Sequence, residues 1–389
     1  MPIVQKGDFL LPAEHAMACW PVIACDQFTS QREWWEERAK EVGSRPSALN
    51  LILPEVYLED ADVQERVGRI HSNMQQILRD SVLRHTGPCF VYTERTLLSG
   101  LVRRGLVCLV DLSAYDPEGR GAIRPTEQTV KERIPPRMQI REGAALELSH
   151  VLLLMDDPSD RILGPLERDR TLPVLYDMEL PGGGGRLRGC LVSGSSLRNT
   201  EEAIAAYESE RTEGLMYAVG DGNHSLAAAR ACMDRARAEG RQGEGLAMVE
   251  LNNVRDSSMA FEPIHRLIPR GGGQVLEALQ TRMPGGTPLR FFLNGQEGRI
   301  HLRPEPARLL AEIQPVLDEI TDGKMDYIHG TGTLRKLTEN GGLGLVMPEI
   351  TREDFFRALG QGVMPRKTFS IGHALEKRYY MEARKISED

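Results

Sequence analysis

The densest set of side chains that could do chemistry lies in LMYAVGDGNHSLAAAR, residues 215–230. An apolar run leads directly into a glycine-containing turn, and an alanine-rich helical pattern follows. Glycine allows positive φ and close approach of the backbone, and the unpaired amides at the start of a helix favour an anion. The order strand, turn and helix therefore predicts a phosphate site at residues 222–225.

Each side chain of this turn has a chemical and a structural interpretation. Asp221 could hold a divalent metal such as Mg²⁺, and His224 could move a proton or donate to a phosphate oxygen. Gly222, Asn223 and Ser225 would then surround the phosphate. Alternatively, Asp221 and Asn223 only form the turn and Ser225 caps the helix. His224 favours the chemical interpretation, because capping does not require it.

A second candidate is the cationic segment IRPTEQTVKERIPPRMQIR, residues 123–141, which holds five Arg or Lys residues. Cations gathered near one carboxylate suit a phosphorylated or carboxylated ligand, with Arg137, Arg141 and, further along the chain, Arg266 as an anion clamp and Glu127 as a general base. The alternative is a solvated helix face with ordinary charge pairs.

Two further segments are compatible with anion binding. FEPIHR places His265 beside Arg266 after a proline, although His265 could equally be a structural histidine with both nitrogens bonded. The tail MPRKTFSIGHALEKRYY, residues 364–380, carries several cations and also His373. Its alternative interpretation is a terminal strand whose charges only aid solubility.

Hydrophobic periodicity alternates between strand-like and helix-like along the chain, which predicts an α/β (α+β) protein with a mixed sheet and several layers. Ser30 with Glu33 predicts a capping box for a helix over 30–42, and Gly87 with Pro88 is expected to end a helix over 60–85. Other predicted elements are an extended run at 51–58, a hairpin of 89–96 with 101–112, a helix from residue 127 broken at Pro135 and Pro136, a buried strand at 151–155, a hairpin loop at 182–185, helices over 195–210 and 225–239, and strands at 215–219 and 248–254.

Composition describes an ordinary globular chain. It has 389 residues, 41% hydrophobic and 27% charged, with a net charge of −8, so no global positive field drives binding to nucleic acid. Six cysteines without a Cys-x-x-Cys pair argue against a disulfide framework and indicate a reducing cytoplasm. Neither a signal peptide nor an apolar run of membrane-spanning length is present, so we expect no membrane partner. Composition shifts place soft domain boundaries near residues 165 and 270, giving an N-terminal α/β domain (1–165), a central domain with the DGNH motif (166–270) and a C-terminal α+β domain (271–389).

Six separated strings resemble one family across nearly the whole chain. CDQFTSQREWWE, LNLILPEVYL, IRPTEQTVKERIPPR, YAVGDGNHSLAAA, FEPIHR and MPRKTFSIGHALEKRYY, in this order, are similar to the bacterial and archaeal family called domain of unknown function 1015. The turn is more distantly similar to the phosphate-binding box of the ParB and sulfiredoxin-like superfamily, which includes nucleotide hydrolases and free-serine kinases. Ser225 stands where that superfamily commonly has arginine, and Thr126 stands where many relatives have histidine before the glutamate.

These observations lead to two functional hypotheses. The first is an enzyme that binds a nucleotide, ATP or ADP, or a phosphorylated metabolite with Mg²⁺ and transfers or hydrolyses a phosphoryl group, with serine as a conceivable acceptor by analogy to the superfamily. The second is a non-catalytic nucleotide or metabolite sensor that acts through a protein partner. Sequence-specific DNA binding is disfavoured by the net charge and by the lack of a basic helix-turn-helix pattern. The expected ligand is thus a small anion, and no feature of the sequence indicates an oligomeric state.

Overall fold

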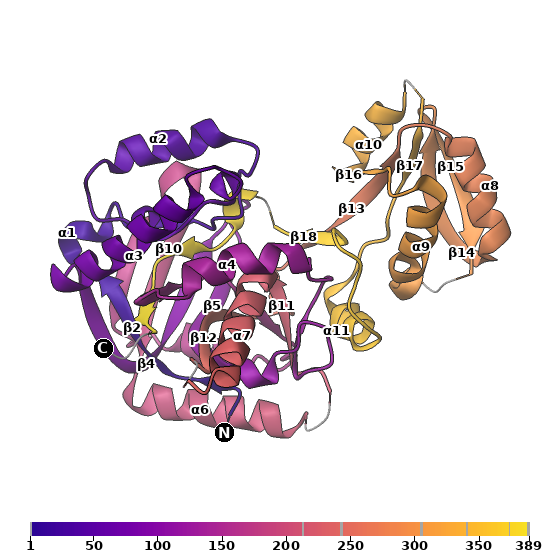
Figure 1. The fold of residues 1–389 in the computed structure, drawn as a ribbon. Helices are drawn as coiled ribbons and strands as arrows, with labels where there is room; N and C mark the ends of the chain where they lie inside the picture. The colour runs from indigo at the N-terminus through magenta and orange to yellow at the C-terminus, as the bar shows by residue number, and fades with distance from the viewer. Residues whose placement is uncertain are drawn as a thin grey trace. The chain divides into compact units, whose positions relative to one another are not determined.

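The computed structural model describes residues 2–211, 214–241, 244–303, 306–339, 341–372 and 374–386 (Figure 1). It divides into two compact units. The first unit comprises Met1–Pro125, Thr129–Ser258 and His373–Asp389, and the second comprises Thr126–Gln128 and Met259–Gly372. The three domains expected from composition stay a prediction.

One large mixed sheet forms the centre of the first unit. Its strands run in the order β6-β11-β8-β12-β5-β4-β2-β20-β7, and β1, β9 and β10 pair off this path. The β11/β6 and β12/β8 pairs are parallel and the other pairs are antiparallel. The bounds are β1 Val4–Gln5, β2 Gly7–Pro12, β4 Leu83–Thr96, β5 Val102–Asp111, β6 Ile123–Pro125, β7 Leu146–Leu148, β8 Leu152–Met155, β9 Val174–Glu179, β10 Arg186–Val192, β11 Tyr217–Asp221, β12 Leu246–Asn253 and β20 Ala383–Lys385.

The two faces of this sheet are buried under different cores. Along β5, Val107 and Leu109 join one hydrophobic cluster while Leu106, Cys108 and Val110 join the other, as the twofold alternation of a strand requires. Figure 1 shows α4 and α7, which pack against each other, side by side in this unit. The helices are α1 Glu14–Met17, α2 Arg32–Val42, α3 Val63–Arg79, α4 Ile134–Arg141, α5 Leu163–Arg168, α6 Gly194–Ser209 and α7 Asn223–Ala238.

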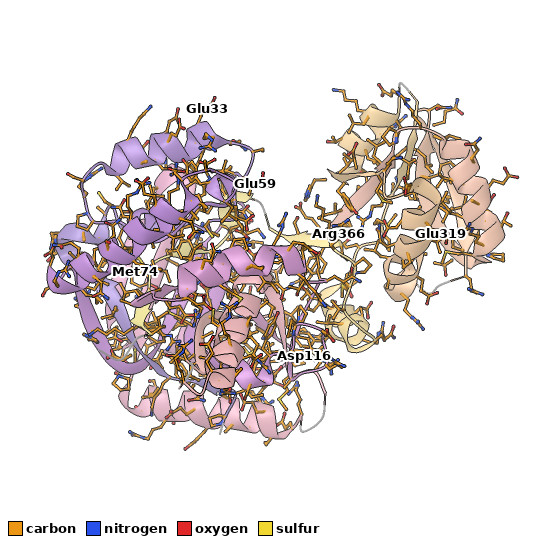
Figure 2. All side chains as sticks on the ribbon, viewed as in Figure 1. Glu33, Glu59, Met74, Asp116, Glu319 and Arg366 are labelled. Atoms are coloured by element: carbon orange, nitrogen blue, oxygen red, sulfur yellow. The ribbon has the colours of Figure 1, made fainter. Side chains whose placement is uncertain are left out.

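Side chains fill the space between α3 and the sheet. Met74 of α3 is buried in this core, whereas Glu33 extends from α2 to the surface (Figure 2). The C-terminal segment completes the same unit, because β20 pairs with β2 and β7, and β19 (Tyr379–Tyr380) pairs with β3 (Val22–Ile23). Residues more than 350 positions apart in the chain therefore share one core.

The second unit is a smaller sheet with helices. Its strands run in the order β15-β14-β17-β13-β16, and β18 also pairs with β13. The bounds are β13 Phe261–Ile268, β14 Pro284–Leu293, β15 Gln296–Leu302, β16 Asp326–His329, β17 Leu343–Leu345, β18 Phe369–Ile371, α8 Gly272–Arg282, α9 Pro306–Thr321, α10 Thr331–Thr338 and α11 Arg352–Gly360. Together, the two units make a mixed α/β protein, as predicted.

Several predicted elements are confirmed. The hairpin is the antiparallel pair β4 and β5, the buried strand is β8, and the glycine-rich loop joins the antiparallel strands β9 and β10. The helix predicted over 195–210 is α6, and the strand predicted over 248–254 is β12. Within the described residues, none of the helices combines the length and hydropathy that crossing a membrane requires.

Other local predictions are wrong for identifiable reasons. The helix over 60–85 ends at Arg79, and β4 continues through Gly87 and Pro88, where a shift in the β2/β4 register accommodates the missing amide donor. Helix α2 has Gln31 rather than Ser30 at its N-cap and no side-chain cap. The extended run at 51–58 overlaps two short 3₁₀ helices, Ala48–Leu51 and Glu55–Tyr57.

The proline pair starts a helix instead of breaking one. Helix α4 begins at Ile134, so Pro135 lies in its first turn, where the amide would have no intrahelical partner in any case. Residue 127 itself lies in an isolated bridge with Met364. The helix expected from residue 127 is therefore shorter and begins later.

Candidate functional site

The predicted strand, turn and helix are present in the first unit. Strand β11 ends at Asp221, Gly222 is the N-cap with φ +75°, and α7 follows directly. A Cβ at residue 222 would lie 2.9 Å from the Cα of Val151, so both the backbone conformation and the packing require glycine. Ser225 lies inside the first turn and its amide donates to the carbonyl of Gly222 at 3.0 Å, so its predicted capping role is not seen.

Asp221 meets a lysine from the far end of the chain. Its Oδ1 accepts from the amide of Gly222 at 3.0 Å, and its Oδ2 lies 3.0 Å from Nζ of Lys377. The two side chains are only 12% and 15% exposed. Burial lowers the pKa of Lys377, but the carboxylates of Asp221 and Asp26 outweigh it and raise that pKa above its ordinary value. Lys377 is therefore a cation at neutral pH.

A second carboxylate and two aromatic side chains adjoin this pair. Oδ2 of Asp26 lies 3.8 Å from Nε2 of His150, and the Tyr380 hydroxyl lies 2.7 Å from Nδ1 of the same ring. Burial raises the pKa of Asp26, but His150, Lys377, a hydrogen bond from Gln27 and the charge of Arg137 hold it below its ordinary value. We call Asp26, His150, Asp221, Lys377 and Tyr380 the charged cluster.

His224 and Asn223 use part of their hydrogen-bonding capacity within the fold. Nε2 of His224 accepts from the amide of Val130 at 3.1 Å, and burial, followed by the charges of Arg137 and Arg133, lowers the pKa of His224 to about 4. The ring is therefore neutral at pH 7 with its proton on Nδ1, which favours donation to a ligand over proton transfer. Asn223 accepts from the Tyr115 hydroxyl and donates to the Thr129 hydroxyl, both at 2.8 Å.

The cationic segment borders a cavity. Arg137, Arg141 and Ser225 line a cavity of about 120 Å³ in the first unit, together with Cys25, His150 and Tyr380. Arg137 pairs with Glu55, and Nη1 of Arg141 donates to Glu147 at 2.7 Å. Two residues of the predicted anion clamp, Arg137 and Arg141, thus line the same cavity as His150 and Tyr380 of the charged cluster.

The remaining predicted residues belong to the second unit. The Glu127 carboxylate accepts from the amides of Lys367 and Thr368 at 2.8 and 2.9 Å. Nδ1 of His265 accepts from the amide of Met347 at 3.2 Å, and burial, then the charge of Arg266, lowers the pKa of His265 to about 4.

Arg266 is fully buried in this unit. It donates to Gln314 and to the carbonyls of Ile264 and Lys367, and its guanidinium lies 4.6 Å from the Tyr327 ring centroid. Glu127 and Arg266 therefore belong to the second unit, where their hydrogen bonds hold the residues around β13.

Among the described residues, no group of three His, Cys, Asp or Glu side chains could hold a metal ion. Asp221, the predicted Mg²⁺ ligand, is paired with an ammonium group. A magnesium ion there would have to displace Lys377 and take its other ligands from phosphate and water. The residues do not form a protein-built metal site, and we derive no step through a metal.

Three cluster residues, Asp26, His150 and Tyr380, were not singled out individually from the sequence, whereas Lys377 is one of the tail cations that it indicated. Asp26 lies in the CDQFTSQREWWE string and Tyr380 in the tail string, so their presence in strings shared with a family was the available signal. His150 lies outside all six strings. His373 of the same tail lies outside the described residues.

Comparison with known proteins gives one family and several distant structural similarities. The family model described as "Protein of unknown function (DUF1015)" matches residues 8–385. No curated protein matches. Among solved structures, C-terminally truncated SbnI from Staphylococcus aureus has 12% identity and a TM-score of 0.37, covering 68% of this chain and 82% of that one.

Two other solved structures show the same level of similarity. A free serine kinase in complex with AMP has 12% identity and a TM-score of 0.39, covering 71% of this chain and 90% of that one. A conserved hypothetical protein from Pyrococcus furiosus has 10% identity and a TM-score of 0.34, covering 72% and 95%. Similarity at this level assigns no activity to this chain.

Proposed function

Because the chain belongs to the DUF1015 family, which is defined without an activity, we propose its function from the site itself: a small-molecule phosphotransferase or phosphohydrolase. The phosphate of the ligand would lie at the turn between β11 and α7, a strand-turn-helix phosphate site of the kind predicted from the sequence. One observation carries the proposal. Lys377, which is charged and largely buried, forms an ion pair with Asp221, the last residue of β11, beside the amino end of the sixteen-residue helix α7.

Phosphoryl transfer depends mainly on positioning and on neutralising charge. Lys377 supplies a full positive charge, the amino end of α7 supplies a partial one, and the Nδ1 proton of His224 adds a donor. An incoming phosphate would take over part of the interaction that Asp221 makes with Lys377. The side chain of Asp221 would then be released toward the ligand or the acceptor.

The neighbouring residues suit binding of the second reactant. Arg137 and Arg141 would hold an anionic acceptor in the cavity beside the turn, as the sequence predicted. Asp26 is ionised and lies 3.8 Å from Nε2 of His150, and the charge of Lys377 helps to lower its pKa, so it is a candidate to accept an acceptor proton. Glu127 stays a proposal for the same role. ATP or ADP as phosphate donor, Mg²⁺ as counterion and serine as acceptor are further parts of this proposal.

A thermal-shift screen tests phosphate binding. ATP, ADP, CTP, phosphoserine and inorganic phosphate would each be added with and without Mg²⁺. A ligand at a hundred times its dissociation constant stabilises the fold by about 2.7 kcal/mol, a shift that is easily measured. We expect at least one of the nucleotides to give a shift, and Lys377→Met to abolish it. Lys40→Met, which removes an exposed lysine of α2, is the matched control and should keep the shift.

Turnover is measured on the same proteins as release of ADP or phosphate with small hydroxylated acceptors. Saturable binding without turnover would support the sensor hypothesis instead. If none of these compounds shifts the unfolding temperature of the native protein, the proposed phosphate site is wrong.

A further inference from the structure

Most of the side chains that line the cavity beside the charged cluster are apolar. Apolar side chains reach it from the segment before α3, from α3, from α4, from β7 and from α7. Examples are Leu53, Met74, Ile140, Leu146 and Ala228. A polar group placed against such a lining would lose its hydrogen bonds to water, so the lining favours a ligand whose main part is hydrocarbon.

The polar groups of the cavity are already largely paired with one another. The Tyr380 hydroxyl bonds to His150, and Arg137 pairs with Glu55. Arg141 keeps one donor unused, because Nη1 donates to Glu147 while the buried Nη2 has no hydrogen-bond partner among the described residues. An unsatisfied buried donor is costly, and a carboxylate is the acceptor that guanidinium groups bind best.

Volume limits the ligand further. The cavity measures about 120 Å³, somewhat less than the roughly 150 Å³ of an engineered cavity that binds benzene. The space suits a molecule of few non-hydrogen atoms with polar atoms at one end only.

From these three observations we infer that the cavity binds a short-chain carboxylic acid with an apolar, branched body, its carboxylate toward Arg141. This deepens the proposed function by naming a substrate class for the acceptor site in place of serine, the acceptor suggested by analogy, and it rests on that proposal only for the acceptor role. Serine, with an amine and a hydroxyl on its small carbon frame, would leave polar groups against hydrocarbon walls. Specificity of this kind follows from the cost of unpaired polar groups.

The test compares 3-methylbutanoate with serine, which have the same number of non-hydrogen atoms, by calorimetric titration of the full chain without nucleotide. We expect 3-methylbutanoate to bind about tenfold or more tightly than serine, since its methyl groups leave water. Equal or tighter binding of serine, or no binding of 3-methylbutanoate, would overturn the inference. Because nucleotide is absent, these outcomes are independent of whether the proposed phosphoryl chemistry exists.

Two variants locate the ligand. Ala144→Leu fills part of the cavity, and Arg141→Met removes the proposed carboxylate partner; each should weaken 3-methylbutanoate binding about tenfold or more. Ala206→Leu on the exposed face of α6 and Arg235→Met, an exposed arginine of α7, are the matched controls and should bind normally.

A measurement on the unmodified protein keeps the test decisive if a variant does not fold. Nuclear Overhauser contacts are expected between the ligand methyl groups and the methyl groups of Met74 and Ile140, both of which line the cavity. Bound ligand without these contacts would place it elsewhere and refute the assignment.

Discussion

Lys377 and Arg378 are consecutive residues of the C-terminal segment, and both are cations in the first unit. They differ in how many of their donors have partners and in how exposed they are. Arg378 is 3% exposed and donates to Glu250 at 2.7 Å, to Glu382 at 2.6 Å and to the carbonyl of Ser149. Lys377 is 15% exposed and lies 3.0 Å from one carboxylate oxygen of Asp221. One cation has its donors engaged around the guanidinium, and the other retains capacity for a ligand.

The carboxylates around the two cations show the same contrast. Burial raises the pKa of Glu250, but the charges of Arg378 and Arg103 hold it below its ordinary value, and the second partner, Glu382, accepts from the Tyr176 hydroxyl. Oδ2 of Asp221 is buried with the Lys377 ammonium group 3.0 Å away, and no donor among the described residues makes a hydrogen bond of good geometry to it. A guanidinium with a partner on each of its nitrogens suits a structural role, whereas a single ion pair beside a cavity suits binding.

The largest predicted effect falls on the structural network. Arg378→Met should lower the free energy of unfolding by about 3–5 kcal/mol, because it leaves Glu250 and Glu382 as uncompensated buried charges. Urea unfolding followed by circular dichroism measures it. Arg235→Met, which breaks an exposed pair with Glu142, should cost about 1 kcal/mol or less. Similar losses in both variants would contradict the structural role of Arg378.

Two glycines with nearly equal φ test the packing at the turn. Gly222→Ala should destabilise by about 3 kcal/mol, since it adds a contact with Val151 to the strain of a positive φ, and it should also weaken the nucleotide shift. Gly240→Ala has a φ of +73° but nothing within 4 Å of the new Cβ, so only the strain of about 1–2 kcal/mol remains. Equal losses by urea unfolding would mean that backbone strain alone explains Gly222.

Lys377→Met can be compared directly with Arg378→Met, because the two residues are adjacent in the chain. We expect a loss of about 1–2 kcal/mol, smaller than for Arg378, because the partly accessible cluster can admit water around Asp221. The same unfolding series measures it. A loss as large as that of Arg378→Met would make the charged cluster a structural network like the other one.

The smallest effect at neutral pH is a pH dependence from His224, because it develops only as the solution is acidified. Its pKa falls from 6.5 to about 4 in the folded protein, so the unfolded chain binds more protons between these values. Stability contributed by the neutral ring is present above pH 6.5 and is lost as pH falls toward 4. His224→Gln should therefore flatten the decline of stability with acidification over this window. His15→Gln, at an exposed position, should leave the slope unchanged.

Much of the local structure could be predicted from the sequence. The β4/β5 hairpin, the buried strand β8, helix α6 and the passage from β11 into α7 follow from periodicity and glycine placement, because these depend on residues close together in the chain. The ends of the elements near Pro88 and Pro135 could not be predicted as well. A register shift between β2 and β4 lets Pro88 lie within a strand, and Pro135 lies in the first turn of α4, where no amide donor is needed.

The site itself was determined partly by sequence and partly by tertiary structure. The turn at Asp221 and Gly222 was visible in the sequence, because its glycine requirement and its helix start are local properties. The partners of the turn were not, because Asp26 and Lys377 reach it from opposite ends of the chain through sheet pairing. Glu127, by contrast, is only a few residues from the α4 segment yet belongs to the second unit. Ion pairs and burial depend on which distant segments meet, and only the folded chain decides that.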